Sequence, residues 1–176
     1  MRTKLCKCGC GERFTPVRPF QQAATIECAL KIARRQRENL DKAEHKARVQ
    51  AARPLSWYVK KAQAACNAYI RERDKDKPCI SCGRFHEGQW HAGHYRTTAA
   101  APGLRFHPFN IWKQCAPCNN HKSGNLTEYR PALIAKIGLS AVEWLEAQNS
   151  PAHYTRDDLL EIEAHYKQLF KQLKEE

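Results

Sequence analysis

Two pairs of cysteines in the chain have the spacing of metal-binding knuckles. Cys79 and Cys82 form one C-x-x-C pair, and Cys115 and Cys118 form the other. Zn²⁺ favours tetrahedral coordination by thiolates, and two such pairs supply four sulfur ligands from two tight turns. A site with four thiolate ligands has no open coordination position, so we expect this zinc to be structural rather than catalytic. Its role would be to hold together a segment that is too small to form its own core.

Histidines and asparagines gather between and just after these pairs. His94 lies in the segment W-H-A-G-H-Y, which is predicted to be a strand, and Asn119 follows Cys118 directly. A neutral imidazole accepts a proton from water near pH 7, and an asparagine offers a carbonyl oxygen to a hard cation such as Mg²⁺ or Mn²⁺. We therefore expect His94 to be a general base and Asn119 to be a ligand of a catalytic divalent ion. The alternatives are a structural histidine and an asparagine that caps a turn or a helix.

Neighbouring residues are assigned supporting roles. His121 is a candidate second metal ligand, or else a contact to the phosphate. We also count Asn110 among the catalytic residues, because we expect it to orient the loop that bears His94. Basic side chains in the same stretch are expected to bind phosphate groups, or else to be ordinary surface charges. These candidates for nucleic-acid binding are Arg96, Arg105, Lys113 and Lys122.

The order of these residues resembles the HNH, or ββα-metal, nuclease superfamily. Members of that superfamily commonly have a histidine at the end of a first strand, a middle asparagine, and a C-x-x-C pair followed by histidine or asparagine and a lysine. The matching residues here are His94, Asn110, Cys115, Cys118, Asn119 and Lys122. Longer segments resemble the lambda-type NinG/Rap recombination endonuclease family. These segments are 56–58, 67–74, 78–83, 92–102, 104–106 and 121–126.

This resemblance implies a metal-dependent DNA endonuclease. Its expected substrates are branched recombination intermediates, such as Holliday junctions and D-loops, cut by phosphodiester hydrolysis. The resemblance also implies a phage- or prophage-encoded protein that acts in the cytoplasm of a bacterial host. Because a junction resolvase cuts two strands, we expect a homodimer, with either the long basic helix or the C-terminal helix as its interface.

One position departs from the superfamily pattern. Many HNH enzymes have aspartate or histidine directly before the general base, as a metal ligand, whereas this chain has Gly93. His91 is the nearest replacement, but residues i and i+3 on a strand point to opposite faces. Either a bulge brings His91 round or another residue supplies the ligand.

The net charge points to a polyanionic partner. The chain carries +12, and residues 1–126 hold 24 basic and 9 acidic residues, a difference of +15, whereas residues 127–176 hold 6 and 9, a difference of −3. Lysine and arginine displace condensed counterions from phosphates, so this asymmetry favours nucleic acid over a basic membrane-surface or protein-binding role. No stretch is long and apolar enough to span a bilayer, and no apolar region follows the basic N-terminus as in a secretory signal. We expect a protein of the cell interior with no membrane partner.

Four further cysteines form a second possible zinc site, at Cys6, Cys8, Cys10 and Cys28. The C-x-C-x-C spacing is cramped, so the alternative is a weakly metallated or disordered arm. An odd total of nine cysteines and the absence of a signal peptide argue against a disulfide scaffold.

The expected architecture is an α+β fold, with a small zinc-bound HNH core flanked by α-helices. We expect an N-terminal arm at 1–28, a basic helical region at 29–75, the core at 76–126 and C-terminal helices at 127–176. Strands are predicted around His94 and Ile111, followed by a helix from Asn119. Serine and threonine predict helix starts at Ser56, Ser140 and Thr155.

Two other classes of function fit parts of these observations. A non-catalytic zinc-containing nucleic-acid-binding module would account for the charge and the cysteines, but would leave the arrangement of His94, Asn119 and Lys122 unexplained. A protein that contacts a host partner through its basic helix is a weaker third possibility.

Overall fold

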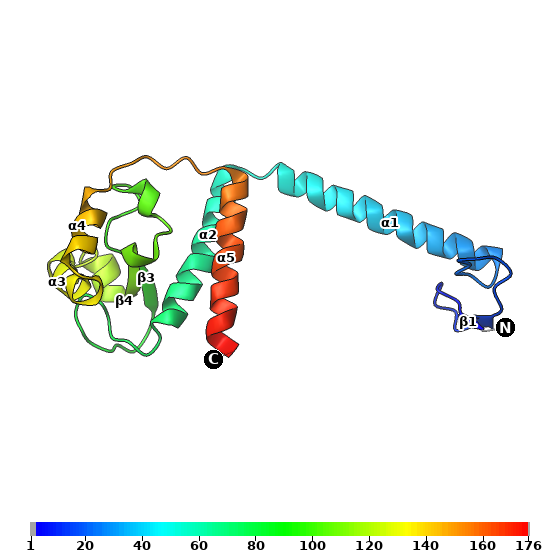
Figure 1. The fold of residues 1–176 in the computed structure, drawn as a ribbon, viewed down its shortest axis with the longest axis horizontal. Helices are drawn as coiled ribbons and strands as arrows, with labels where there is room; N and C mark the ends of the chain where they lie inside the picture. The colour runs from blue at the N-terminus through cyan, green and yellow to red at the C-terminus, as the bar shows by residue number, and fades with distance from the viewer. Residues whose placement is uncertain (1–2, 176) are drawn as a thin grey trace. The chain divides into compact units, whose positions relative to one another are not determined.

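The computed structural model describes residues 3–175 and divides into two compact units, Met1–Arg53 and Pro54–Glu176 (Figure 1). The sequence suggested four segments. Contacts instead group the N-terminal arm with the first long helix, and the second helix with everything that follows it. The fold is a mixed α and β architecture in which helices predominate and both sheets have two strands. Within residues 3–175, no helix combines the length and apolar character needed to cross a bilayer.

The first unit is a cysteine-containing arm in front of one long helix. Strands β1 (Lys4–Leu5) and β2 (Arg13–Phe14) pair antiparallel, and α1 runs from Ile26 to Ala51. The side-chain oxygen of Thr25 caps this helix by accepting a hydrogen bond from the backbone N–H of Cys28 at 3.2 Å. The basic helix predicted in this region is therefore confirmed and begins slightly earlier than expected. The apolar cluster of the unit consists of Cys6, Ala23, Cys28 and Ile32.

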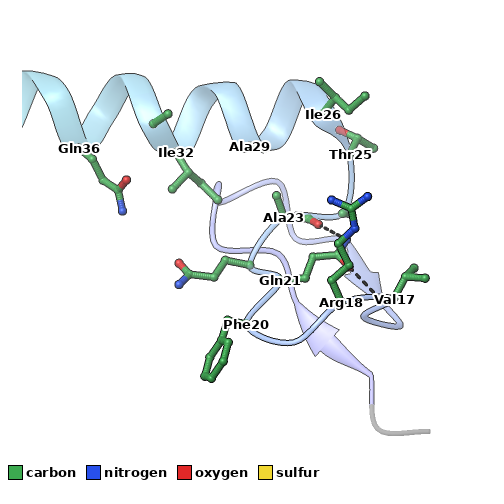
Figure 2. A pocket seen from close by; sticks show the side chains of 13 residues that line it. Val17, Arg18, Phe20, Gln21, Ala23, Thr25, Ile26, Ala29, Ile32 and Gln36 are labelled. Atoms are coloured by element: carbon green, nitrogen blue, oxygen red, sulfur yellow. Dashed lines mark hydrogen bonds between the residues drawn. The ribbon is translucent and has the colours of Figure 1, made fainter.

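An open groove lies between α1 and the segment that precedes it (Figure 2). Its volume is about 900 Å³, and Val17, Phe20 and Ile26 are exposed along it. The side-chain oxygen of Gln21 accepts from the backbone N–H of Val17 at 2.9 Å, which fixes this segment locally. None of the histidines or asparagines expected to do chemistry lines this groove.

The second unit is built on two helices that lie side by side, α2 (Leu55–Arg73) and α5 (Arg156–Glu175) (Figure 1). An apolar stripe on α5 enters their shared core, where Leu159 and Tyr166 are buried and Ile162 packs beside them. The hydroxyl of Tyr166 donates to the backbone carbonyl of Phe106. The chain's own core therefore covers the part of the stripe formed by Leu159 and Tyr166.

The predicted helix caps have different outcomes. At α5, the backbone N–H of Asp158 donates to the hydroxyl of Thr155 at 3.2 Å, and the backbone N–H of Thr155 donates to the carboxylate of Asp158 at 2.8 Å, which confirms the capping box. The prediction of Ser56 as the N-cap is wrong, because α2 begins two residues earlier, at Leu55, with Pro54 as its N-cap. The extended backbone of Pro54 starts this helix without a side-chain cap.

Two shorter helices, α3 (Leu126–Ile137) and α4 (Leu139–Ala147), pack together beyond the sheet. They join at Gly138, whose φ of 85° favours glycine and ends α3 where the sequence predicted. Because Gly138 is also the N-cap of α4, Ser140 already lies inside that helix and the capping box predicted there does not form. Both helices contribute to an apolar core cluster. Its buried residues are Ile80, Tyr95, Ala101, Leu104, Tyr129, Leu133, Val142 and Leu145.

The central sheet consists of β3 (Trp90–His94) and β4 (Ile111–Cys115), which pair antiparallel. His94 lies opposite Ile111, and Trp90 lies opposite Cys115. The two strands predicted around His94 and Ile111 are therefore confirmed. This register places the candidate base at one end of the sheet and a cysteine ligand at the other.

Short turns surround the sheet. Two 3-10 turns, η1 (Pro102–Leu104) and η2 (Pro108–Asn110), lead into β4, and a single π turn, η3 (Pro117–His121), follows it. The helix predicted to start near Asn119 is only the single π turn η3. Positive φ values at residues 123–125 break the chain after η3, so regular helix resumes only with α3.

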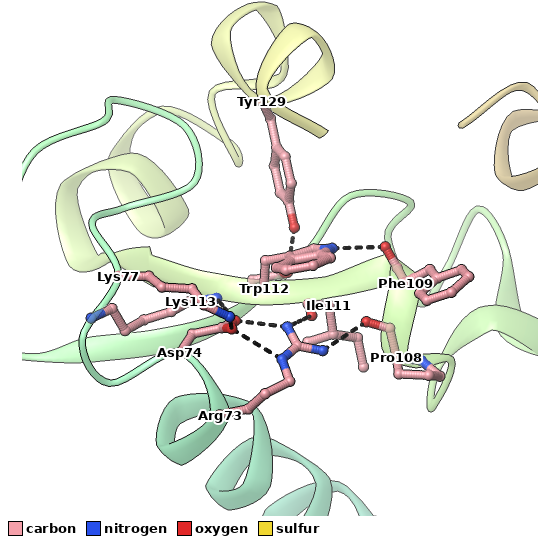
Figure 3. Close-up of polar contacts among 10 residues, drawn as sticks. Arg73, Asp74, Lys77, Pro108, Phe109, Ile111, Trp112, Lys113 and Tyr129 are labelled. Carbon is pink, nitrogen blue, oxygen red and sulfur yellow. Dashed lines mark hydrogen bonds and ion pairs between the residues drawn. The ribbon is translucent and has the colours of Figure 1, made fainter. Parts of the chain in front are cut away.

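A buried carboxylate joins α2 to β4 (Figure 3). Asp74 is 1% exposed and accepts hydrogen bonds from the guanidinium of Arg73 at 2.7 and 3.0 Å and from the ammonium of Lys77 at 2.9 Å. It also accepts from the backbone N–H of Lys113 at 3.2 Å, and Arg73 donates to the carbonyl of Ile111 at 3.0 Å. Burial alone would raise the pKa of Asp74, but the bonds and charges of Arg73 and Lys77 hold that pKa below its usual value. The carboxylate is therefore charged and fixes the sheet against α2.

Replacing Asp74 with alanine is expected to lower the free energy of unfolding by about 3 to 5 kcal/mol, because the change leaves buried donors without their acceptor. Chemical denaturation of the variant measures this loss. Asp76→Ala is the matched control, since Asp76 is exposed close by in the same connecting segment. Equal destabilisation by the two substitutions would contradict a structural role for the buried carboxylate.

Candidate metal and active site

Four cysteines meet at the end of β4. The sulfur atoms of Cys79, Cys82, Cys115 and Cys118 all lie within 4.8 Å of one another. Cys82 is half-buried and the other three are buried. This grouping could hold one metal ion, and four thiolates are the ligands that a structural zinc prefers. The two knuckles therefore come together as the sequence predicted.

The surroundings of the cluster favour a thiolate at Cys79. Burial alone would raise the pKa of Cys79, but backbone N–H groups at Cys82, Cys115 and Ser81 donate to its sulfur and hold the pKa below its ordinary value. The distance from the N–H of Cys115 to this sulfur is 3.4 Å. A contact that the sequence did not predict lies on the other side of the cluster, where Nε2 of His86 is 3.2 Å from the sulfur of Cys82. The thiolate is the form that binds metal, so one ligand is prepared by the backbone itself.

A polar pocket of about 390 Å³ lies beside this cluster. It is walled by β3, by one face of α2, by residues of the loop after β3 and by the π turn η3. It is smaller than the apolar groove of the first unit, but it brings together His91, His94 and Asn119 and is therefore the candidate active site. Its lining residues are Gln63, Asn67, Arg71, Gln89, Trp90, His91, Ala92, His94, Thr98, Arg105 and Asn119.

His94 is held by one ring nitrogen. Its Nε2 lies 2.9 Å from the backbone carbonyl oxygen of Arg105. A carbonyl can only accept, so this nitrogen carries the proton in the neutral ring, and Nδ1 keeps its lone pair. Burial lowers the pKa of His94 most strongly, and the charge of Arg105 lowers it further, while the bond to the Arg105 carbonyl raises it; the net pKa lies below the usual value. The ring is therefore neutral near pH 7, with Nδ1 able to accept a proton.

His91 and Asn119 form a second pair in the pocket. Nδ1 of His91 lies 3.3 Å from the side-chain nitrogen of Asn119, which also donates to Asn120 at 2.9 Å. Nε2 of His91 is buried and has no hydrogen-bond partner within residues 3–175. A buried polar atom without a partner is costly unless a ligand or an ion satisfies it. The pair therefore fits a bound group that the chain itself does not supply.

His91 and His94 both reach the pocket, although their spacing placed them on opposite faces of a strand. No bulge accounts for this, because β3 pairs with β4 in regular register from Trp90 to His94. In the described part of the chain, β3 has β4 as its only partner strand, and its other edge is open. Consecutive residues 90–92 line the pocket, so we infer that it runs along this open edge and receives side chains from both faces.

Gly93 separates the two histidines because no side chain fits there. A Cβ atom at this position would lie 2.0 Å from Oε1 of Gln114, which is fully buried. The carbonyl of Gly93 accepts a hydrogen bond from the hydroxyl of Tyr129 at 3.0 Å, and Figure 3 shows that ring projecting from α3 toward the sheet. The residue before His94 therefore cannot supply a side-chain ligand while Gln114 keeps this position.

One wall of the pocket was not predicted. Gln63, Asn67 and Arg71 are spaced four residues apart on α2 and project from one face of that helix into the pocket lining. The sequence signal was a polar row at helical spacing opposite the apolar positions of α2. It was missed because α2 was treated as a flanking helix, separate from the cysteine-bound segment.

Asn110 does not reach the pocket. It is fully buried, and its side chain accepts from the backbone N–H of Arg96 at 2.8 Å and donates to the carbonyls of Arg96 and Leu104 at 3.0 and 3.2 Å. Its backbone carbonyl accepts from the N–H of Tyr95 at 2.8 Å. Its inclusion in the catalytic group is therefore corrected to a positioning role, since it fixes the chain directly after His94 but cannot contact a substrate.

Two of the basic candidates are used inside the fold. Lys113 is 4% exposed, its ammonium donates to the carbonyl of Lys75 at 2.7 Å, and it lies over the ring of Trp90, so the prediction that it binds phosphate is wrong. The guanidinium of Arg96 donates to the carbonyl of Glu146 at 2.6 Å and to the side chain of Asn149 at 2.8 Å. This engagement turns Arg96 toward the end of α4, and it does not line the pocket.

The remaining candidates divide between the pocket and the open surface. Arg105 lines the pocket. His121, the last residue of η3, and Lys122, which follows it, are exposed and are not part of the pocket lining, so the structure does not bring them together with His94. Of the η3 residues, Asn119 lines the pocket.

The N-terminal cysteines also form a cluster. The sulfur atoms of Cys6, Cys8, Cys10 and Cys28 lie within 4.8 Å of one another and could hold a metal ion. The cramped C-x-C-x-C segment achieves this with positive φ values at Gly9 and Gly11, conformations that glycine adopts without strain. The backbone N–H groups of Cys8 and Ala24 lower the pKa of Cys6 to about 7.

Comparison with known proteins adds an independent line of support. The profile of the family described as Bacteriophage Lambda NinG protein matches residues 1–176. Protein ninG of Salmonella phage P22 is 46% identical over 184 residues, covering 94% of this chain and 91% of the relative. Protein ninG of Escherichia phage lambda is 46% identical over 183 residues, covering 94% and 90%. A probable HNH endonuclease of Lactococcus phage SK1 is 29% identical over 89 residues, covering 48% of this chain and 90% of that relative. No solved structure matches the chain.

Proposed function

The chain belongs to the NinG family of bacteriophage proteins, and from this membership and the surroundings of His94 we propose that it is a metal-dependent DNA endonuclease. The observation that carries the proposal is a neutral imidazole, held at one nitrogen and available at the other, in the same polar pocket as His91 and Asn119. The partial similarity to a probable HNH endonuclease supports the same reaction class. We propose branched recombination intermediates as substrates, because of the resemblance to recombination nucleases.

His94 acts as the general base in this proposal. Its Nδ1 accepts the proton of an attacking water, while the bond from Nε2 to the carbonyl of Arg105 keeps the ring in the correct tautomer. Asn110 holds the backbone directly after His94, so the ring does not have to be ordered when DNA binds. The four-cysteine cluster fixes the end of β4 and therefore the start of η3, where Asn119 lies.

A divalent cation is implied by the reaction and fits the residues present. The buried, unpartnered Nε2 of His91 would hold it in a ring protonated at Nδ1, with the Asn119 amide turned so that its oxygen accepts from that N–H. Such an ion neutralises charge that develops on the phosphate during hydrolysis. Gly93 cannot contribute a side chain, so His91 replaces the ligand that the superfamily commonly carries directly before the base.

The charge of the chain supports DNA as the partner. The excess of basic residues over acidic ones lies in residues 1–126, which include every element that lines the pocket. We propose that the protein acts in the bacterial host cytoplasm as a homodimer, so that two strands of a junction are cut together.

The rival function is a non-catalytic zinc module that binds nucleic acid. The discriminating experiment incubates the full chain with a synthetic four-way junction, with and without Mg²⁺ or Mn²⁺, and measures binding and cleavage in parallel. Cleavage that depends on the added ion and leaves product ends within the junction is the expected result. Tight binding without cleavage in either ion would establish the rival instead.

The pH dependence of cleavage follows from the state of His94. Because its pKa lies below the ordinary value of 6.5, the ring stays neutral as the pH falls through 6.5, and the rate should decline only at lower pH. A cation bound nearby would lower the pKa of His94 further, because it disfavours the charged ring. Single-turnover rates across the acidic range, at saturating metal, measure this limb. A midpoint above 6.5 would contradict His94 as the base.

A further inference from the structure

We propose that α2 supplies a second wall of the active site, in which Asn67 and Arg71 bind the phosphodiester backbone next to the bond that is cut. This inference rests on the proposed nuclease function and assigns a binding role to a helix outside the cysteine-bound segment. It starts from three side chains on one helix face that line the same pocket as His94.

The hydrogen bonds along this wall have a fixed direction. Arginine can only donate, so the contact between Nη1 of Arg105 and Oε1 of Gln63, at 3.4 Å, makes that oxygen the acceptor. The amide nitrogen of Gln63 must then be the donor to Oδ1 of Asn67, at 2.8 Å. Consequently, the side-chain oxygen of Asn67 is already bonded, and its amide nitrogen remains available to donate a hydrogen bond into the pocket.

Arg71 adds a charge at the end of the row. It is exposed, it lines the pocket, and it makes no ion pair or hydrogen bond with any residue from 3 to 175. It lies one helical turn beyond Asn67, about 6 Å along the axis, so the two side chains can contact the same phosphate or two neighbouring ones. Free donors and one uncompensated cation suit an anionic oxygen and disfavour a metal ion.

The row therefore has a different task from His94. It holds the strand while the base acts, so its loss should weaken DNA binding and leave the acidic limb of the pH profile in place. Asn67→Asp is the sharpest change, because aspartate keeps the size of the side chain and the acceptor for Gln63 but replaces the donor with a negative oxygen. Arg71→Ala removes the charge from an exposed position.

The experiment measures the affinity for a synthetic four-way junction in a His94→Ala background, which prevents cleavage, over a series of salt concentrations. We expect each change, Asn67→Asp and Arg71→Ala, to weaken binding by about tenfold or more at low salt. Arg71→Ala should also reduce the salt slope of log K by roughly 0.9, the value for one phosphate contact. Lys171→Ala is the control, since it removes an exposed cation from α5 that does not line the pocket.

The outcomes separate this inference from the proposed function. Wild-type affinity and salt slope in both α2 variants, or an equal loss in Lys171→Ala, would overturn the role of the row even if the wild-type protein cuts DNA. Tighter binding of Mn²⁺ by Asn67→Asp, with unchanged DNA affinity, would overturn it as well, because the row would then face a cation. Zinc content and thermal unfolding of each variant, matching the parent, ensure that the measured loss arises at the DNA contact.

Discussion

Replacing His94 with alanine is expected to lower the rate of DNA cleavage by about 10²- to 10⁴-fold, the usual contribution of a positioned general base, while junction binding changes little. In the pocket, Nε2 of His94 is fixed by the backbone carbonyl of Arg105, which leaves Nδ1 of the same ring free to accept a proton. His94 lies between the two cysteine pairs but is not one of the four clustered residues that could hold a metal ion, so the substitution should leave the metal content of the chain unchanged. Single-turnover cleavage of a four-way junction, with binding measured in parallel, tests the prediction.

Two comparisons distinguish a chemical role of His94 from a structural one. Added imidazole should restore part of the activity of the alanine variant, because a small base can enter the space left by the ring, whereas a packing defect would not respond. His153→Ala removes an exposed histidine from outside the pocket and should cleave at the wild-type rate. A His94 variant that cuts as fast as the wild type in saturating Mg²⁺ would remove the basis of the proposed mechanism.

The sequence predicted the parts of the fold that depend on local patterns. The long basic helix was predicted from a stretch that no glycine or proline interrupts, and the reciprocal cap of Thr155 and Asp158 follows from side-chain chemistry. Serine caps were less reliable, because a preceding Pro54 or Gly138 can start a helix from the backbone alone. The shortness of η3 was not predicted, since the positive φ values that end it include Ser123, which has no intrinsic need for that conformation.

The candidate site was predicted where its residues are close in sequence to the cysteines. His94, His91 and Asn119 line one pocket because the knuckles and the sheet between them are short-range features. The contribution of α2 could not be predicted in this way, since its position depends on packing against α5 and on the bonds of Asp74 across the sheet. The same tertiary contacts bury Lys113, whose sequence context is indistinguishable from that of a surface lysine.

The four-cysteine cluster should have the largest effect on structure. Replacing Cys115 with serine is expected to remove one zinc ion per chain and to abolish the cooperative unfolding of the second unit. Structural zinc sites bind with apparent free energies of about 10 to 16 kcal/mol, which is available to folding only when all ligands are present. A sheet of two strands is marginal by itself, and here the cluster joins the end of β4 to the segment that follows α2. Elemental analysis and chemical denaturation, monitored by the tryptophans of the second unit, measure the two losses.

Matched cysteine variants make this prediction specific. Cys10→Ser should also remove one zinc ion, from the N-terminal cluster, but it should leave the unfolding of the second unit unchanged because Cys10 belongs to the other compact unit. Cys66→Ala removes a buried thiol from the core between α2 and α5 and should keep the full metal content, with only the modest destabilisation of a lost side-chain contact. If Cys115→Ser instead retains both cooperative unfolding and DNA cleavage, the cluster is not what holds Asn119 beside His94. The pocket would then have to be maintained by the bonds of Asp74 and Tyr129 across the sheet.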